Sequence, residues 1–353
     1  MKIFSYIVVF IIGAVCGIWV FLLLPKDIIQ NDDKFEVVNN YSLTRDVTVY
    51  MPWWDQDRAF ETIKQNKGKV KYIKAFWYEA KKDGSIKKYT GAENDEIEEF
   101  AKQNSIGFIP VINNDFSAET AKELVSNSEV SAKHLDNLVD MVQENEFDGL
   151  EIDYEGLDAE DGANFSVFIT NLSSRLHQNN KVLHIAVHAK TSDEGTWDGP
   201  KAQDWNVIGE AVDQVNVMAY DYSWATSEAG NIAPLGWIEE VLDYAITKLP
   251  KEKISLGINF YGYDWVKEAG QDVLYEDILE LISEHKPTIS TTDEFEKTFL
   301  YTKDDENHTV YFADSETVTK RLELVSKHDL GGISIWRVGG EDPAIWAAVA
   351  SNL

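Results

Sequence analysis

Cysteine is almost absent from this chain of 353 residues, and the single one is Cys16. One cysteine cannot form a disulfide within the chain, so no disulfide framework holds the fold together. Basic residues are scarce as well, because 32 Lys and Arg stand against 61 Asp and Glu, for a formal net charge of -29. A surface this acidic repels a polyanion, so we expect no nucleic-acid partner.

Charged residues are missing from the whole segment between Ile3 and Leu24, which is apolar. Its roughly 22 residues would span about 33 Å as a helix, enough to cross the hydrocarbon layer of a membrane. No small-x-small cleavage site follows Leu24, and the residue before Cys16 is Val15, which disfavours lipidation. We therefore predict an uncleaved transmembrane signal anchor over residues 1–25 and attachment to the membrane through this helix.

A break in composition is also lacking after residue 46, so one large domain over residues 46–353 is the simplest organisation. The polar residues 26–45 are predicted to be a short stalk between anchor and domain. A short amino-terminal tail with one lysine, Lys2, usually stays inside the cell, so we expect the domain to be extracellular. The sequence gives no indication of the oligomeric state.

From Asp46 onward the chain repeats one pattern, in which an apolar strand is followed by a loop and an amphipathic helix. Such alternation gives a parallel sheet, and eight units in roughly 310 residues suit a (β/α)₈ TIM barrel, for which about 250 residues are typical. A doubly wound open sheet is the alternative. The predicted strands are Val47–Met51, Val70–Phe76, Gly107–Ile112, Gly149–Tyr154, Leu183–Val187, Gln214–Ala219, Ile254–Phe260 and Gly332–Trp336.

The interval between the seventh and eighth strands is too long for one helix. It contains a helical segment, Leu274–Glu284, and two strand-like segments, Thr298–Thr302 and Thr309–Phe312, joined by a polar turn. We predict a small helix-plus-hairpin insertion here, followed by the helix Thr317–His328.

The predicted fourth strand carries an unusual number of acidic residues. Strand side chains alternate, so Glu151, Asp153 and Glu155 share one face, and the other face is hydrophobic. Three buried like charges repel, so at least one carboxyl should keep its proton at neutral pH, as a general acid requires. A solvated sheet face is the alternative reading of such alternation, but the apolar opposite face favours the inside of a barrel.

Aromatic residues gather where the predicted strands end, which in such barrels is the catalytic face. Flat aromatic rings beside acidic groups suit sugar rings, although each ring alone is more often core packing. The residues are Trp53, Trp54, Trp77, Tyr78, Tyr220, Tyr222, Trp224, Tyr261, Tyr263, Trp265 and Trp336.

These motifs resemble glycoside hydrolase family 18, the chitinases and related endo-N-acetylglucosaminidases. The family's fourth-strand pattern Asp-x-x-Asp-x-Asp-x-Glu is matched by Asp148, Glu151, Asp153 and Glu155, with Glu151 where Asp is usual. Three further motifs follow in the same order as in the family. The first two strands look like those of the family's bacterial cell-surface branch, which includes peptidoglycan-acting members. The further motifs are Met218-Ala219-Tyr220-Asp221, Gly257 to Gly262, and Gly331-Gly332 followed by Trp336.

The resemblance implies a catalytic set of Glu155, Asp153 and Tyr220. Glu155 would be the proton donor, Asp153 would orient the substrate's 2-acetamido group, and Tyr220 would hydrogen-bond the acetamido oxygen. It implies no cofactor and no metal. The residues expected at the substrate are Asp148, Glu151, Met218, Asp221, Trp336, Trp77, Tyr261 and Trp224, of which Asp148 and Glu151 would adjust the pKa of Asp153.

The expected function is retaining, substrate-assisted hydrolysis of β-1,4-linked N-acetylglucosamine polymers, either chitin-like chains or the glycan of peptidoglycan. The acidic surface mildly favours a neutral chain, whereas an anchor favours the cell's own wall. A non-catalytic carbohydrate-binding protein on the same fold is the alternative, and a Mg²⁺ enzyme is a weaker one because the carboxylates concentrate on one strand.

Overall fold

The structure is a computed structural model that describes residues 6–7, 24–25 and 43–353. The predicted anchor and stalk fall almost wholly outside these residues; within them, β1 (Tyr6–Ile7) and β2 (Leu24–Pro25) form an antiparallel pair. No helix in the described residues is both long and apolar enough to cross a membrane.

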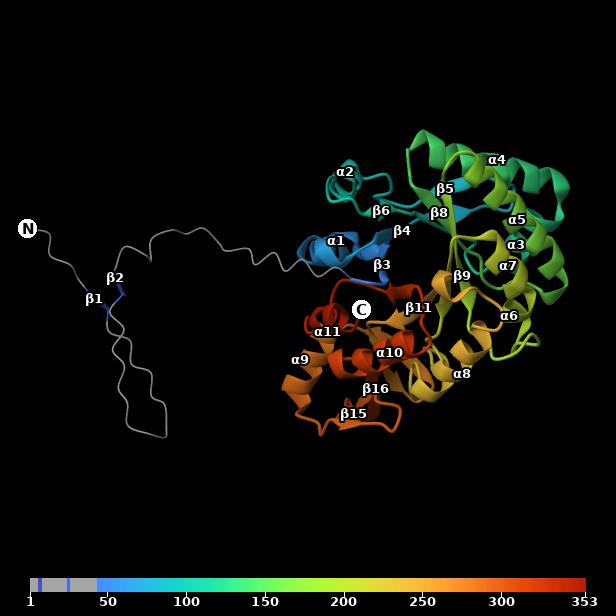
Figure 1. Ribbon diagram of the computed structural model, residues 1–353. Helices are drawn as coiled ribbons and strands as arrows, with labels where there is room; N and C mark the ends of the chain where they lie inside the picture. Colours follow the sequence, from blue (N-terminus) through green and yellow to red (C-terminus); the bar gives the residue numbers. More distant parts are fainter. Residues whose placement is uncertain (1–5, 8–23, 26–42) are drawn as a thin grey trace, which may run out of the picture. The chain divides into compact units, whose positions relative to one another are not determined.

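Eight parallel strands in the described part of the chain close into a barrel, with helices around it (Figure 1). The closure is direct, because β3 pairs with both β17 and β4. The predicted TIM-barrel architecture is therefore confirmed and the open sheet is excluded. In order around the barrel the strands are β3 (Asp46–Pro52), β4 (Tyr72–Ala80), β7 (Val111–Asn113), β8 (Gly149–Asp153), β9 (Val182–His188), β10 (Gln214–Met218), β11 (Ile254–Asn259) and β17 (Gly332–Trp336).

The helices cover the outside of the barrel, and a continuous apolar core lies between them and the strands. Several begin with side-chain caps, as Ser117 shows by accepting the backbone N–H of Thr120. The helices are α1 (Gln56–Asn66), α2 (Asp95–Gln103), α3 (Ala118–Ser126), α4 (Ser128–Glu144), α5 (Gly162–Gln178), α6 (Asp198–Ala202), α7 (Trp205–Ala211), α8 (Leu235–Ala245), α10 (Ser315–Lys327) and α11 (Ile345–Asn352).

Two predicted strands differ from the observed ones. The third is divided by Pro110 into β6 (Gly107–Phe108) and β7, since proline has no N–H to continue the ladder. The second is longer than predicted, runs through Trp77 to Ala80, and pairs there with β5 (Ile86–Lys88).

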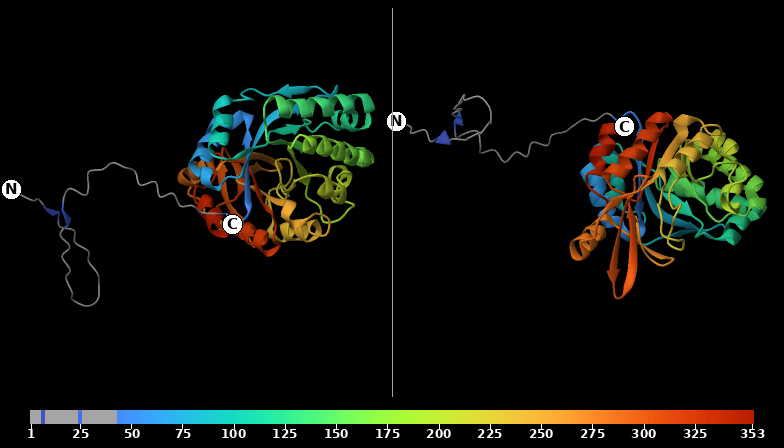
Figure 2. Two further views of the ribbon diagram at one scale, coloured as in Figure 1. Left: turned by 45° about the horizontal axis from the view of Figure 1, so that its top comes forward. Right: turned by 90° about the horizontal axis from the view of Figure 1, so that it is seen from below.

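The insertion between β11 and β17 is larger than predicted. The helix α9 (Tyr275–His285) and the hairpin are present, but a second hairpin precedes them, and all five strands form one antiparallel sheet. The hairpin of β15 and β16, in orange, projects from the barrel in the right-hand view of Figure 2. The strands are β12 (Gly262–Val266), β13 (Ala269–Val273), β14 (Ser290–Thr291), β15 (Lys297–Lys303) and β16 (Glu306–Phe312).

Candidate active site

Three acidic side chains of the fourth barrel strand lie at successive depths inside the barrel. Glu151 is fully buried, Asp153 is 8% exposed, and Glu155 follows the end of β8 at the mouth. Leu150, Ile152 and Tyr154 face the other way, into the apolar core. The alternation predicted from the sequence therefore holds, and it puts the charges on the barrel's inner face.

Glu151, the deepest of the three, is held by two partners that reach it across the barrel interior from β3 and β4. Its carboxylate accepts a hydrogen bond from the hydroxyl of Tyr50 and forms an ion pair with Lys74. Asn216 donates in turn to the Tyr50 hydroxyl at 2.6 Å. Burial raises the pKa of Glu151 and lowers the pKa of Lys74, and the attraction between the two groups opposes both shifts.

Asp153 lies closer to the barrel mouth than Glu151, and it has fewer hydrogen-bond partners. Its Oδ1 atom is buried and has no hydrogen-bond partner among the described residues. Burial and the charge of Glu151 raise the pKa of Asp153 to about 7, while Lys74 acts in the opposite direction. Asp153 therefore changes charge close to neutral pH, and one of its oxygens is left without a partner in the described part of the chain.

Glu155 is placed to hold a proton. Burial raises its pKa well above the ordinary range, and the charges of Asp153 and Asp221 add to the shift. Its main chain is fixed from the neighbouring loop, because Asn114 accepts from the Glu155 N–H at 2.9 Å and donates to its carbonyl at 2.8 Å. Gly156, at φ +66°, lets the chain turn where any Cβ would meet the carbonyl of Phe116.

Asp153 and Glu155 open into a cavity of about 690 Å³ at the carboxyl ends of the strands. Six of the predicted site residues line it, namely Asp153, Glu155, Met218, Tyr220, Asp221 and Trp336. Trp53 and Trp54, two of the aromatic residues that the sequence places at strand ends, line it as well. The sequence reasoning did not assign a role to the other lining residues, which are Tyr50, Phe76, Glu79, Lys81, Lys87, Tyr89, Asn113, Asn114, Asp115, Phe116, Ala186 and Asn216.

The segment after β10 brings Tyr220 and Asp221 to the cavity. The ring of Tyr220 packs closely on Gly257, where a Cβ would lie 2.9 Å from a ring carbon, so β11 needs a glycine there. Asp221 accepts hydrogen bonds from Tyr261 at 2.5 Å and Tyr263 at 3.2 Å. Burial raises the pKa of Asp221 and these two bonds oppose the shift.

Tyr261 and Trp224 lie beside the cavity and not in it. Tyr261 lines an adjoining hollow of about 500 Å³, which shares Trp54, Asp221 and Trp336 with the first. Trp224 is 53% exposed on the loop after β10 and lines neither hollow.

Three predicted substrate-contacting residues lie away from the cavity. Trp77 is fully buried against Phe108 and donates to Gln56. Its ring faces the helices because side chains alternate along β4 and the preceding Phe76 faces the cavity. Asp148 precedes β8, at the amino end of the barrel, where it accepts the N–H of Phe108 at 2.7 Å. Glu151 lies below the cavity floor.

A larger hollow, of about 1070 Å³, lies at the amino ends of the strands beside α2. Asp148 borders it together with acidic residues of α2, but neither Asp153 nor Glu155 does. Burial also raises the pKa of Glu98, on the larger hollow, to about 7. The smaller cavity is nevertheless the candidate active site, since it lies at the carboxyl ends of the strands and holds Asp153 and Glu155 together.

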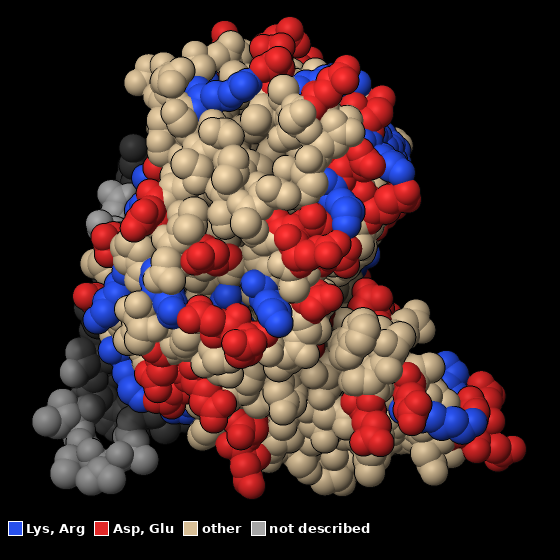
Figure 3. Space-filling view, turned by 90° about the vertical axis from the view of Figure 1, so that its right-hand side faces the viewer, with Lys and Arg blue, Asp and Glu red and all other residues tan. Residues whose placement is uncertain are grey.

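Two further properties bear on ligands. Among the described residues no three His, Cys, Asp or Glu side chains are arranged to hold a metal ion. On the face that Figure 3 shows, acidic side chains are spread among basic ones, with no extended basic patch.

Known proteins resemble the chain over most of its length. The family model described as "Glycosyl hydrolases family 18" matches residues 46–341. The "Uncharacterized glycosylase YvbX" of Bacillus subtilis (strain 168) is 29% identical over 261 residues, 71% of this chain and 76% of that protein. The "Cortical fragment-lytic enzyme" of Bacillus anthracis is 28% identical over 295 residues, 80% of this chain and 67% of that protein. The crystal structure of a chitinase from Chromobacterium violaceum superposes with a TM-score of 0.81 at 26% identity, covering 87% of this chain and 98% of that one.

Proposed function

This chain belongs to the glycosyl hydrolases of family 18, and from that membership we propose that it cleaves β-1,4-linked N-acetylglucosamine polymers with retention of configuration. Relatives named as chitinases and as cortex-lytic enzymes support this choice of sugar. The observation that carries the proposal is the pair Asp153 and Glu155, which opens into one cavity with Tyr220 and Trp336.

The proposed reaction uses the substrate's own acetamido group as the nucleophile, an exception to the scheme with two enzyme carboxylates. Glu155 gives its proton to the glycosidic oxygen as that bond breaks, while the acetamido carbonyl oxygen bonds to the anomeric carbon. Ionised Asp153 orients the acetamido group and stabilises the positive charge of the ring that forms. Water then attacks the anomeric carbon as its bond to the acetamido oxygen breaks, and the Glu155 carboxylate takes up the proton of the water.

Two other groups support this geometry. Tyr220 keeps its proton, because burial and the surrounding carboxylates raise its pKa well above the ordinary range, and it can donate to the acetamido oxygen. Trp336 closes the floor of the cavity, where its flat face suits the sugar ring next to the cleaved bond.

Replacing the acid provides the test. We expect Glu155→Gln to lower kcat on chitooligosaccharides by about 10²-fold or more, the usual contribution of a general acid. Asp148→Asn is the matched control, since this carboxylate of the same motif lies at the other end of the barrel. Its kcat should stay within about threefold of the wild type. An unchanged rate in Glu155→Gln would remove Glu155 from the mechanism.

Product analysis distinguishes the substrates. Purified peptidoglycan and chitooligosaccharides would be incubated with the protein in parallel, and the released reducing ends identified. A wild-type protein that binds these glycans without releasing products would instead be a carbohydrate-binding protein.

The location is part of the proposal. The apolar run from Ile3 to Leu24 supports a single-pass anchor over residues 1–25 with the barrel outside the cell. Cells that produce the full chain should keep it in the membrane fraction, with the barrel open to added protease. Release of the barrel into the medium would contradict the anchor.

A further inference from the structure

A histidine on the strand next to β8 lies beside the proton donor. In the register of β8 and β9, Glu151 lies opposite His184. Because alternate residues face the same side, Asp153 corresponds to Ala186, and Glu155 to His188 at the end of β9. We propose that His188 is a positioning residue for Glu155, whose carboxylate it holds by donating from Nδ1 once the proton has left. The inference rests on the role of Glu155 proposed above.

The imidazole is close to Glu155 and has no other side-chain partner in the described residues. Its Nδ1 atom lies 3.6 Å from Oε2 of Glu155, and the two side chains are 13% and 16% exposed. The other ring nitrogen, Nε2, is buried without a hydrogen-bond partner among those residues. Glu155 is thus the one side chain of that region toward which His188 can direct its ring proton.

The ring is held in place by its own surroundings. Trp197 packs edge-on against it, with ring centroids 4.6 Å apart. The main-chain N–H of His188 donates to the side chain of Gln203 at 2.8 Å, which fixes the backbone beneath the ring. Lys190 fixes the same loop by donating to the carbonyls of Pro200 at 3.0 Å and Gln203 at 2.5 Å. A ring fixed from behind can hold the carboxyl in front of it in one orientation.

The charge of the ring matters as much as its place. Burial lowers the pKa of His188 to about 4, so at neutral pH the ring is uncharged. A cationic ring would lower the pKa of Glu155 and deplete the acid form that the reaction needs. A neutral N–H donor instead gains most of its energy when Glu155 becomes an anion.

Apart from His188, the titratable groups around Glu155 either oppose its ionisation or do nothing to stabilise its carboxylate. Asp153 on β8 and Asp221 after β10 both raise its pKa by like-charge repulsion. Tyr220, also after β10, stays protonated. His188 on β9 is therefore the group that can stabilise the carboxylate between proton donation and proton recovery. Its own proton stays on Nδ1 through both steps, so no additional proton acceptor is required.

The test compares two replacements of His188. Asn places its Nδ2 donor near the position of Nδ1, whereas Phe fills the space under Trp197 without a donor. We expect His188→Phe to lower kcat by about tenfold with little change in KM, the usual effect of losing a hydrogen bond to a charged group. We expect His188→Asn to stay within about threefold of the wild type.

A titration of Glu155 by carboxyl ¹³C NMR in the resting protein supplies a readout that needs no turnover. In His188→Phe the pKa of Glu155 should rise by about one unit, and the alkaline limb of the pH profile should move up with it. Equal pKa values in wild type and His188→Phe would overturn the inference, as would a folded His188→Asn as slow as the Phe variant. A shifted pKa in a protein that cleaves no N-acetylglucosamine substrate would uphold the contact and reject the proposed function.

Discussion

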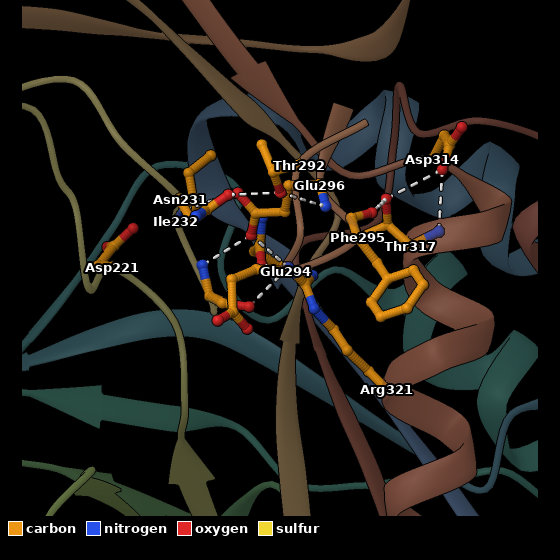
Figure 4. Close-up of polar contacts among 12 residues, drawn as sticks. Asp221, Asn231, Ile232, Thr292, Glu294, Phe295, Glu296, Asp314, Thr317 and Arg321 are labelled. Atoms are coloured by element: carbon orange, nitrogen blue, oxygen red, sulfur yellow. Dashed lines mark hydrogen bonds and ion pairs between the residues drawn. The ribbon is translucent and has the colours of Figure 1, made fainter. Parts of the chain in front are cut away.

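In the part of the chain that the structure describes, two ion pairs are shielded from solvent, one inside the barrel and one where the insertion joins it. Lys74 and Glu151 lie beneath Asp153 and Glu155. Arg321 of α10 and Glu296 at the start of the insertion's hairpin form the other pair, shown in Figure 4. Their chemistry is similar, and their neighbours differ.

The insertion pair is surrounded by partners. Glu296 accepts the backbone N–H groups of Ile232 and Ala233, both at 2.7 Å. Arg321 also donates to Asn259 at the end of β11, at 2.8 Å. Asp221 lies apart from this cluster in Figure 4. The pair therefore joins insertion, helix and loop, and neither of its charges is among the causes that shift the pKa of Asp153 or of Glu155.

The barrel pair, by contrast, has a neighbouring carboxyl with an unused hydrogen-bond acceptor. Asp153 lies next to it on the same strand, with Oδ1 lacking a hydrogen-bond partner among the described residues. The charges of Glu151 and Lys74 both act on the pKa of Asp153. The difference teaches that a buried ion pair with complete partners stabilises architecture, whereas one beside a free carboxyl also determines when that carboxyl ionises.

The largest effects should come from replacing one member of each pair. Glu151→Gln and Glu296→Gln should each cost about 3–5 kcal/mol of unfolding free energy, because each leaves a buried cation unpaired. Their pH profiles should differ. Glu151 raises the pKa of Asp153 and Lys74 lowers it, so removing Glu151 lowers that pKa from about 7.

The rate of the wild type should fall as the pH drops below about 7, where Asp153 gains a proton. In Glu151→Gln this fall should begin at lower pH, and in Glu296→Gln it should stay in place. Chemical unfolding and kcat/KM against pH measure the two quantities. If the pH profile of kcat/KM moved equally in both variants, the conclusion that only the barrel pair controls the ionisation of Asp153 would be wrong.

An intermediate effect is expected from two matched tyrosines. Tyr261 donates to Asp221 at the site, and Tyr301 donates to Asp264 within the insertion, both at 2.5 Å. Tyr261→Phe should lower kcat/KM by about tenfold, because the pKa of Asp221 rises when the bond is lost. Tyr301→Phe should cost about 1 kcal/mol of stability and leave kcat/KM within about twofold. Equal kinetic losses would show that the insertion communicates with the site.

The smallest effect concerns exposed apolar side chains in the same two regions. Trp224 lies on the loop after β10, and Leu300 is 68% exposed on the insertion's hairpin. Trp224→Ala should raise KM by about threefold to tenfold, the value of one stacking contact, for oligosaccharides long enough to pass beyond the cavity. Leu300→Ala should leave KM unchanged. An effect of Trp224→Ala on the shortest cleaved oligosaccharide would contradict its place outside the cavity.

The sequence predicted much of this arrangement because its signals are local. Eight apolar strands alternating with helices specify the barrel, and the period of two along β8 puts Glu151, Asp153 and Glu155 on one face. Strand direction then brings the strand ends Tyr220 and Trp336 to the same cavity as Glu155.

The remaining features depend on contacts between distant segments. The register shift against β7 puts Glu79 in the cavity and Tyr78 in the core, where unbroken alternation would place them the other way round. Trp77 was misplaced for a local reason, since alternation after Phe76 already turns its ring toward the helices. The partner of Glu151 was missed because Lys74, on a strand that reads as apolar, is 77 residues away in sequence. Asp148 shows a different error, since the direction of β8 already places a residue before Gly149 at the amino end.

Asn114 carries one consequence for redesign. Its side chain bonds both main-chain groups of Glu155, so the acid takes its position from the loop that also presents Phe116 to the cavity. Exchanging that loop to admit a bulkier glycan would therefore also displace Glu155. The substrate specificity that this loop determines can change without moving Glu155 only if an asparagine remains at position 114.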